Sequence, residues 1–314
     1  MAVALKAENV SIRYIVGDFK DIGIKEYVMR HLTGNYHVKE FWADKNVTFS
    51  LEQGDMLGII GTNGAGKSTL LKAVSQIMVP TEGSIQVHGK IAALLELASG
   101  FDPDLTVKEN TYLRGALLGY TRGFMNEKYD EIIEFAELTD FQDRPFKQLS
   151  SGMKSRLAFS IACLVNPDIM ILDEVLSVGD GAFRRKSEER MKMILDSGVT
   201  GLLVSHSVDQ IRSMCNKILW LDHGKQVCFS DDAEMVCDAY EEFLITRKLP
   251  ENMNEIRKRA VDYQNRLEKQ KQERKKTERE TLLEMLKRGS SSAAKEAAEE
   301  YLAEYGKTKL EQKR

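Results

Sequence analysis

The segment 61–69 of this chain reads GTNGAGKST and fits the pattern G-x-x-x-x-G-K-[ST]. In such a segment, glycines let the backbone wrap closely around a phosphate, and successive N–H groups attract its charge. Lys67 is predicted to reach the terminal phosphate oxygens, and Ser68 to ligate Mg²⁺. The segment follows an apolar run predicted as a strand and precedes a predicted helix, so the sequence favours a nucleotide-phosphate loop over a structural glycine turn. The predicted loop residues are Gly61, Thr62, Asn63, Gly64, Ala65, Gly66, Lys67, Ser68 and Thr69.

Two adjacent carboxylates form a second candidate group. Asp173 and Glu174 follow the apolar run 169–172, and ligands of open parallel sheets bind at the carboxyl ends of strands. Asp173 is placed to hold Mg²⁺, mainly through its water, and Glu174 to orient and polarise an attacking water. A strand that ends in Asp-Glu is by itself equally compatible with an ordinary turn or a helix cap. Together with Lys67, the pair predicts hydrolysis of a nucleotide.

The elements that must position these residues alternate between strands and helices. Apolar periodicity and turn residues predict a central strand at 56–60 and a capping box at Thr106 and Glu109. The repeated order of strand and helix implies a mostly parallel sheet with helices on both faces. The predicted strands are 3–14, 46–51, 56–60, 84–87, 91–95, 169–172 and 202–205, and the predicted helices include 67–76, about 126–138, 150–164 and 183–195.

Composition places limits on the class of protein. The 314 residues, 42% of them hydrophobic, suit one substantial α/β domain with an appendage. No apolar run approaches the roughly 18 residues that a membrane-spanning helix needs, and no export signal is readable at the N-terminus. The cysteines lack metal-ligand spacing and are expected to be reduced core residues of a cytoplasmic protein. The net charge is −3, yet basic residues outnumber acidic ones from Glu251 onward, which marks the tail as a separate object.

Two further motifs distinguish this chain from other proteins that contain a phosphate loop. The segment Leu149-Ser150-Ser151-Gly152-Met153-Lys154 opens a predicted helix before the carboxylate strand, and Ser205-His206-Ser207 closes the strand after it. In this order, a phosphate loop, an LSGGQ-like signature, a carboxylate strand and a switch histidine resemble the ATPase domain of ABC transporters. The resemblance implies a P-loop NTPase of ABC type, with a mostly parallel sheet core, an antiparallel β subdomain and a helical subdomain, followed here by a charged α-helical C-terminal extension.

That resemblance implies roles for individual residues. ATP and Mg²⁺ would be the cofactors, and two copies would pair head to tail so that Ser150 and Gly152 of one complete the phosphate site of the other. His206 would contact the γ-phosphate. The alternatives are that Ser150 only caps its helix and that His206 is a satisfied strand-end histidine. Tyr14 matches the aromatic that stacks on adenine, Trp42 is its weaker rival, and an ordinary strand-end aromatic is the alternative.

The sequence also departs from the family pattern. The signature reads SSGM where the family has SGGQ, and no glutamine follows the middle strand, where Leu94-Leu95-Glu96-Leu97 stands. Glu96 is the nearest substitute as a metal-site residue, although spacing equally allows Leu97 at that position.

The segment 175–183, VLSVGDGAF, resembles the hallmark of ATPase subunits that export O-antigen, capsule or teichoic acid. The segments 94–101 and 41–43 match the same group. The implied function is an ATPase dimer bound to two membrane permease subunits at the cytoplasmic face of the cell membrane, powering export of a lipid-linked polysaccharide. Efflux of a drug or peptide is the alternative, followed by a soluble ABC ATPase. No nucleic-acid partner is expected, because the features of translation- and chromosome-type ATPases are missing.

The predicted domains are an ATPase domain over 1–246 and a charged helical tail over 247–314. The ATPase domain contains an insertion at about 17–44 and a helical subdomain at about 104–165. The insertion and the helical block are candidates for the permease-facing surface, and the insertion is alternatively a surface loop that packs on its own domain. The tail either binds a partner or is simply a solvated helix.

Overall fold

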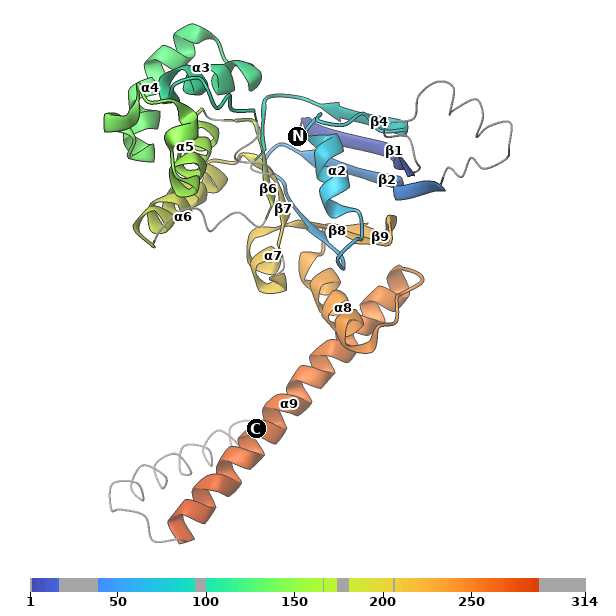
Figure 1. Ribbon diagram of the computed structural model, residues 1–314. Helices are drawn as coiled ribbons and strands as arrows, with labels where there is room; N and C mark the ends of the chain where they lie inside the picture. Colours follow the sequence, from blue (N-terminus) through green and yellow to red (C-terminus); the bar gives the residue numbers. More distant parts are fainter. Residues whose placement is uncertain are drawn as a thin grey trace, which may run out of the picture. The chain divides into compact units, whose positions relative to one another are not determined.

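The computed structural model describes residues 2–16, 39–93, 100–165, 167–173, 181–205 and 207–287 (Figure 1). The chain divides into two compact units. One contains Met1–Cys237 with Pro250–Met253, and the other contains Asp238–Leu249 with Asn254–Arg314. The division falls inside helix α8 (Ala233–Thr246). The predicted boundary between 246 and 247 stays a prediction.

The first unit is built on a nine-stranded sheet in the order β4-β1-β2-β9-β8-β3-β7-β6-β5. The strands β8, β3, β7, β6 and β5 run parallel, whereas β1 pairs antiparallel with β2 and β4. The predicted mostly parallel core is confirmed. The strands are β1 (Val3–Val16), β2 (Lys39–Glu52), β3 (Met56–Ile60), β4 (Glu82–Val87), β5 (Ile91–Ala93), β6 (Ile169–Asp173), β7 (Thr200–Val204), β8 (Lys217–Asp222) and β9 (Lys225–Ser230).

Helices of this unit cover the sheet and form a separate block. Helix α2 packs against β2 and β4, while α3, α4 and α5 contact one another in the helical block (Figure 1). The block has its own apolar core, which includes Met125, Ile132 and Leu157. The helices are α2 (Lys67–Val74), α3 (Val107–Leu117), α4 (Arg122–Ala136), α5 (Ser151–Leu164), α6 (Gly181–Asp196) and α7 (Val208–Met214).

Local sequence signals explain several helix starts. The predicted capping box is present, because the Thr106 side chain accepts a hydrogen bond from the Glu109 backbone and the Glu109 carboxylate accepts one from Thr106 N–H at 2.8 Å. Helix α4 begins at Arg122, earlier than predicted, because the Thr121 hydroxyl caps it. The four cysteines are buried and none forms a disulfide, which confirms their expected place in the core.

The second strand differs from its prediction. β2 begins at Lys39 rather than near residue 46, since pairing extends along β1 as far as the Val16–Lys39 register. Residues 39–44, assigned to the insertion from sequence, are therefore strand. The rest of the insertion lies outside the described residues.

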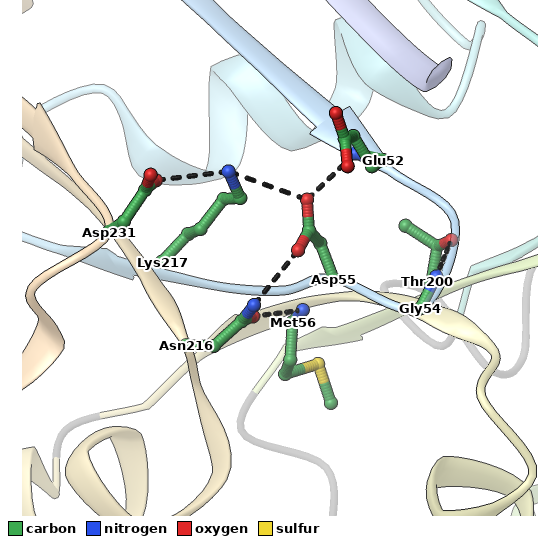
Figure 2. A network of polar contacts seen from close by, with 8 residues as sticks. All are labelled: Glu52, Gly54, Asp55, Met56, Thr200, Asn216, Lys217 and Asp231. Carbon is green, nitrogen blue, oxygen red and sulfur yellow. Dashed lines mark hydrogen bonds and ion pairs between the residues drawn. The ribbon is translucent and has the colours of Figure 1, made fainter. Parts of the chain in front are cut away.

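A polar network holds the start of β3 (Figure 2). Asp55 accepts hydrogen bonds from the Glu52 backbone N–H at 2.7 Å and from Asn216 Nδ2 at 2.8 Å, and Lys217 Nζ lies 3.6 Å from its carboxylate. Lys217 also pairs with Asp231 at 3.0 Å. The network joins the β2–β3 turn to the start of β8 and the residue after β9. It therefore fixes the amino-terminal end of β3, whereas the phosphate loop follows the carboxyl-terminal end of that strand.

The second unit contains the rest of α8 and the helix α9 (Met253–Lys287). Arg266 binds both carboxylate oxygens of Glu242 at 2.8 and 3.1 Å, and Gln264 donates to Asp238 at 2.6 Å. The predicted charged helix is confirmed over the described part of the tail. In the described ranges, no helix combines the length and the apolar character needed to cross a membrane.

Candidate functional site

The predicted phosphate loop connects β3 to α2. All five residues of β3 are buried, so the loop starts from a fixed point in the middle of the sheet. Gly66 precedes the helix with φ of 107°, in the left-handed region that favours glycine. A Cβ atom at Gly66 would overlap the Asp44 carboxylate and lie 2.7 Å from the Ala43 carbonyl oxygen. Only glycine fits this position.

Lys67 is the first residue of α2 and folds back over the loop. Its Nζ atom donates to the carbonyl oxygens of Gly61 at 2.6 Å and Thr62 at 3.1 Å. No side chain caps α2. The helix therefore presents backbone N–H groups and a lysine at one end, which suits a phosphate group.

A cavity of about 400 Å³ opens at the loop. It gathers residues from β1, β2, the loop and β7, which are separated in the sequence. Ser68 is one of the residues that line the cavity, at the position where a hydroxyl ligand of Mg²⁺ is expected. The lining residues are Tyr14, Phe41, Ala43, Asn63, Gly64, Ala65, Gly66, Lys67, Ser68, Thr69 and Val204.

Two aromatic side chains share this cavity. Tyr14 and Phe41 are opposite each other in the β1–β2 register and are 37% and 56% exposed. Trp42 is paired with Arg13 instead, and the Arg13 guanidinium lies 5.5 Å from its ring. Because side chains alternate along a strand, Trp42 points to the other face of the sheet. The cavity thus contains Tyr14 rather than its rival, and it adds Phe41, which sequence reasoning missed.

The predicted carboxylate strand ends beside the loop. Asp173 is opposite Val204 in the β6–β7 register, and Val204 is opposite Ile59 in β3. The backbone of Asp173 is thus brought to the sheet edge that carries the phosphate loop. Glu174, His206, Glu96 and the alternative Leu97 lie outside the described residues, and their predicted roles stay predictions.

The signature segment begins α5. The Ser150 hydroxyl caps the helix by accepting a hydrogen bond from Met153 N–H at 3.2 Å. Ser150 and Gly152 are both exposed, and a Cβ atom at Gly152 would meet nothing within 4 Å. Ser150 can therefore cap its helix while the segment remains accessible to a second molecule.

A buried acidic residue also lies at the loop and was not identified from sequence. Asp44 is fully buried, and neither of its carboxylate oxygens has a hydrogen-bond partner among the described residues. Burial raises the pKa of Asp44 to about 8. The sequence placed this residue at the end of an insertion, where its burial could not be foreseen.

Comparison with known proteins agrees with this geometry. Residues 45–177 match the family model described as ABC transporter. The O-antigen export system ATP-binding protein RfbB of Klebsiella pneumoniae is 37% identical over 227 residues, which cover 72% of this chain and 92% of that protein. The chain belongs to the ABC transporter ATP-binding proteins. In this family, ATP hydrolysis is coupled to transport.

Other relatives extend the comparison of this ABC protein. The teichoic acids export ATP-binding protein TagH of Bacillus anthracis is 38% identical over 244 residues, covering 78% of this chain but only 43% of TagH. A solved dimeric structure of the ATP-binding cassette MJ0796 bound to ADP and Pi has a TM-score of 0.55 at 23% identity, covering 72% of this chain and 97% of that one. The predicted fold class is confirmed.

Proposed function

We propose that this chain hydrolyses ATP to power the export of a lipid-linked polysaccharide of the O-antigen or teichoic acid type. The observation that carries the proposal is the cavity in which Tyr14, Lys67 and Ser68 meet at the carboxyl edge of the sheet. The named activities of RfbB and TagH, together with the VLSVGDGAF segment, favour this class of cargo over a drug or peptide.

In this proposal the nucleotide lies along the cavity with its base at the aromatic pair. Tyr14, with Phe41 beside it, stacks on adenine, and residues 61–69 bind the phosphates through backbone N–H groups and Lys67. Ser68 and Asp173 would hold Mg²⁺, which would supply positive charge beside the phosphates. Glu174 activates the attacking water, and His206 contacts the γ-phosphate.

Two copies of the chain act together in this mechanism. Ser150 and Gly152 are exposed at the start of α5, where they are available to the nucleotide bound by a partner subunit. The N–H groups at this helix start suit a phosphate that carries several negative charges. We therefore propose a head-to-tail homodimer attached to two permease subunits at the cytoplasmic face of the membrane.

We propose that the permease-facing surface includes the helical block, where α3 lines a cavity of about 420 Å³. Leu117 of α3 and Ile77, which follows α2, line it and are 62% and 60% exposed. Apolar side chains at such exposure favour burial against a partner. Leu117→Asp should abolish co-purification with the permease while ATP binding persists. Met193→Asp on α6, at a similarly exposed position, is the matched control.

The experiment for cargo and catalysis is depletion of the protein followed by rescue. Cells receive either the wild type or Glu174→Gln, and surface polysaccharide and intracellular lipid-linked glycan are measured together. Loss at the surface with accumulation inside, rescued only by the wild type, is the expected result. Normal surface glycan in depleted cells without an accumulated intermediate would refute the polysaccharide assignment and leave the ATPase assignment standing.

A further inference from the structure

The strongest unassigned feature is the Asp44 carboxyl group behind the phosphate loop. It is fully buried, and it lies against Gly66, the residue that precedes α2. Neither carboxylate oxygen has a hydrogen-bond partner among the described residues. A carboxyl group without partners in such a site is far more stable when it is neutral.

The packing around Asp44 leaves little room for relaxation. Asp44 is opposite Ile12 in the β1–β2 register, and both side chains are buried. One residue further along β2, Lys45 N–H donates to the Gly224 carbonyl oxygen at 2.7 Å. Gly224 N–H in turn donates to the Ala65 carbonyl oxygen at 3.0 Å. These backbone bonds tie β2, the β8–β9 turn and the loop together, so the carboxyl group is held in place.

Charged groups lie on the neighbouring elements, yet no hydrogen bond of the described residues reaches either carboxylate oxygen of Asp44. Two of these groups are engaged elsewhere: Arg13 pairs with Glu40 at 2.9 Å, and Lys67 Nζ bonds the loop carbonyl oxygens. An ionised Asp44 would therefore lack close compensation. The charged or titratable residues within two sequence positions of Ile12, Asp44, Gly66 or Gly224 are Arg13 and Tyr14 on β1, Lys45 on β2, Lys67 on α2, and Asp222, His223 and Lys225 around the β8–β9 turn.

We propose that Asp44 is a positioning residue that must be neutral for the phosphates of ATP to bind, so that binding takes up a proton from solvent. The inference rests on the proposed nucleotide site. Two negative groups would otherwise compete for one helix N-terminus, the phosphates in front of Gly66 and the carboxylate behind it. The neutral carboxyl group fills the space that only glycine leaves open.

The pKa of about 8 for Asp44 places the effect in an accessible range. Below that pH the carboxyl group is already protonated, and binding needs no proton. Above it, each additional pH unit should raise the dissociation constant for ATP about tenfold until the pKa of the bound state is reached. The last ionisation of a phosphate group lies at pH ~6, so ATP is almost fully ionised above about pH 8 and contributes little to this effect.

The test measures ATP binding by calorimetry with the full-length chain, in the presence of EDTA to prevent hydrolysis. Titrations between about pH 7 and pH 9.5 in two buffers of different ionisation enthalpy give the protons taken up on binding. The wild type should approach one proton at about pH 9, and its affinity should fall over the same range. Asp44→Asn should show neither effect, whereas Glu52→Gln, which removes an exposed carboxylate from the same strand, should behave as the wild type.

The outcomes separate the two proposals. ATP binding by the wild type without proton uptake, or a parallel loss of affinity in Asp44→Asn, would overturn the role of Asp44 alone. Failure of the wild type to bind ATP at about pH 7 would overturn the nucleotide site itself. Asp44→Leu provides a second variant if the amide does not fold, and proton uptake by the wild type needs no variant.

Discussion

The buried carboxyl group of Asp44 also predicts a pH-dependent stability that can be measured without nucleotide. Its pKa rises from 3.8 to about 8 because burial penalises the charged form. Between these values the folded chain keeps a proton that the unfolded chain loses. The free energy of unfolding therefore falls as pH rises, and it stops falling through this group above about pH 8.

The magnitude follows from the size of the shift. One pKa unit corresponds to about 1.4 kcal/mol, so the wild type should lose about 3 kcal/mol relative to Asp44→Asn between about pH 5.5 and pH 8. Side-chain exposure is zero, so solvent screening reduces this value little. The free energy of unfolding of Asp44→Asn minus that of the wild type should consequently be larger at pH 8 than at pH 5.5.

Urea unfolding followed by tryptophan fluorescence provides the assay. The chain has two tryptophans, Trp42 and Trp220, and both belong to the first unit, so the signal reports that unit alone. Taking the difference between variant and wild type at each pH removes the titration of all other carboxylates. A difference that stays constant from pH 5.5 to 8 would show that Asp44 is ionised in the folded chain and would refute the reasoning.

Four further substitutions, one of them with a control variant, test the site and the fold. Gly66→Ala should destabilise the chain by roughly 1–3 kcal/mol and abolish ATP binding, measured by unfolding and calorimetry, because φ is positive and a Cβ atom has no space. Tyr14→Ala should weaken ATP binding by about 1–3 kcal/mol, and unchanged affinity would remove the stacking role. Glu174→Gln should lower ATP turnover by about 10²–10⁴-fold while binding persists, and unchanged turnover would sink its assignment as the base. Lys217→Met should lower the free energy of unfolding by about 1–2 kcal/mol, since Asp55 loses a partner at 13% exposure, whereas Lys6→Met in an exposed pair should change it by less than about 1 kcal/mol.

Local signals in the sequence determined the central strand, the phosphate loop and the helix that follows it. The apolar run before Gly61 and the helical pattern after Lys67 are short-range features, so they predicted the strand, the loop and the helix that the structure contains. The capping box at Thr106 and the cap at Ser150 likewise depend on neighbours three residues away. Such interactions join residues that are close in the sequence, so they do not depend on the tertiary structure.

Only the tertiary structure decided which distant residues meet. The β1–β2 register places Phe41 opposite Tyr14 and turns Trp42 to the other face, which a long intervening segment hides from sequence reasoning. The same register, with the β8–β9 turn packed on the loop, buries Asp44 against Gly66. The sequence specified the chemistry of the phosphate loop because that chemistry is local, whereas the aromatic pair and the buried carboxyl group depend on strand pairing between segments far apart in the chain.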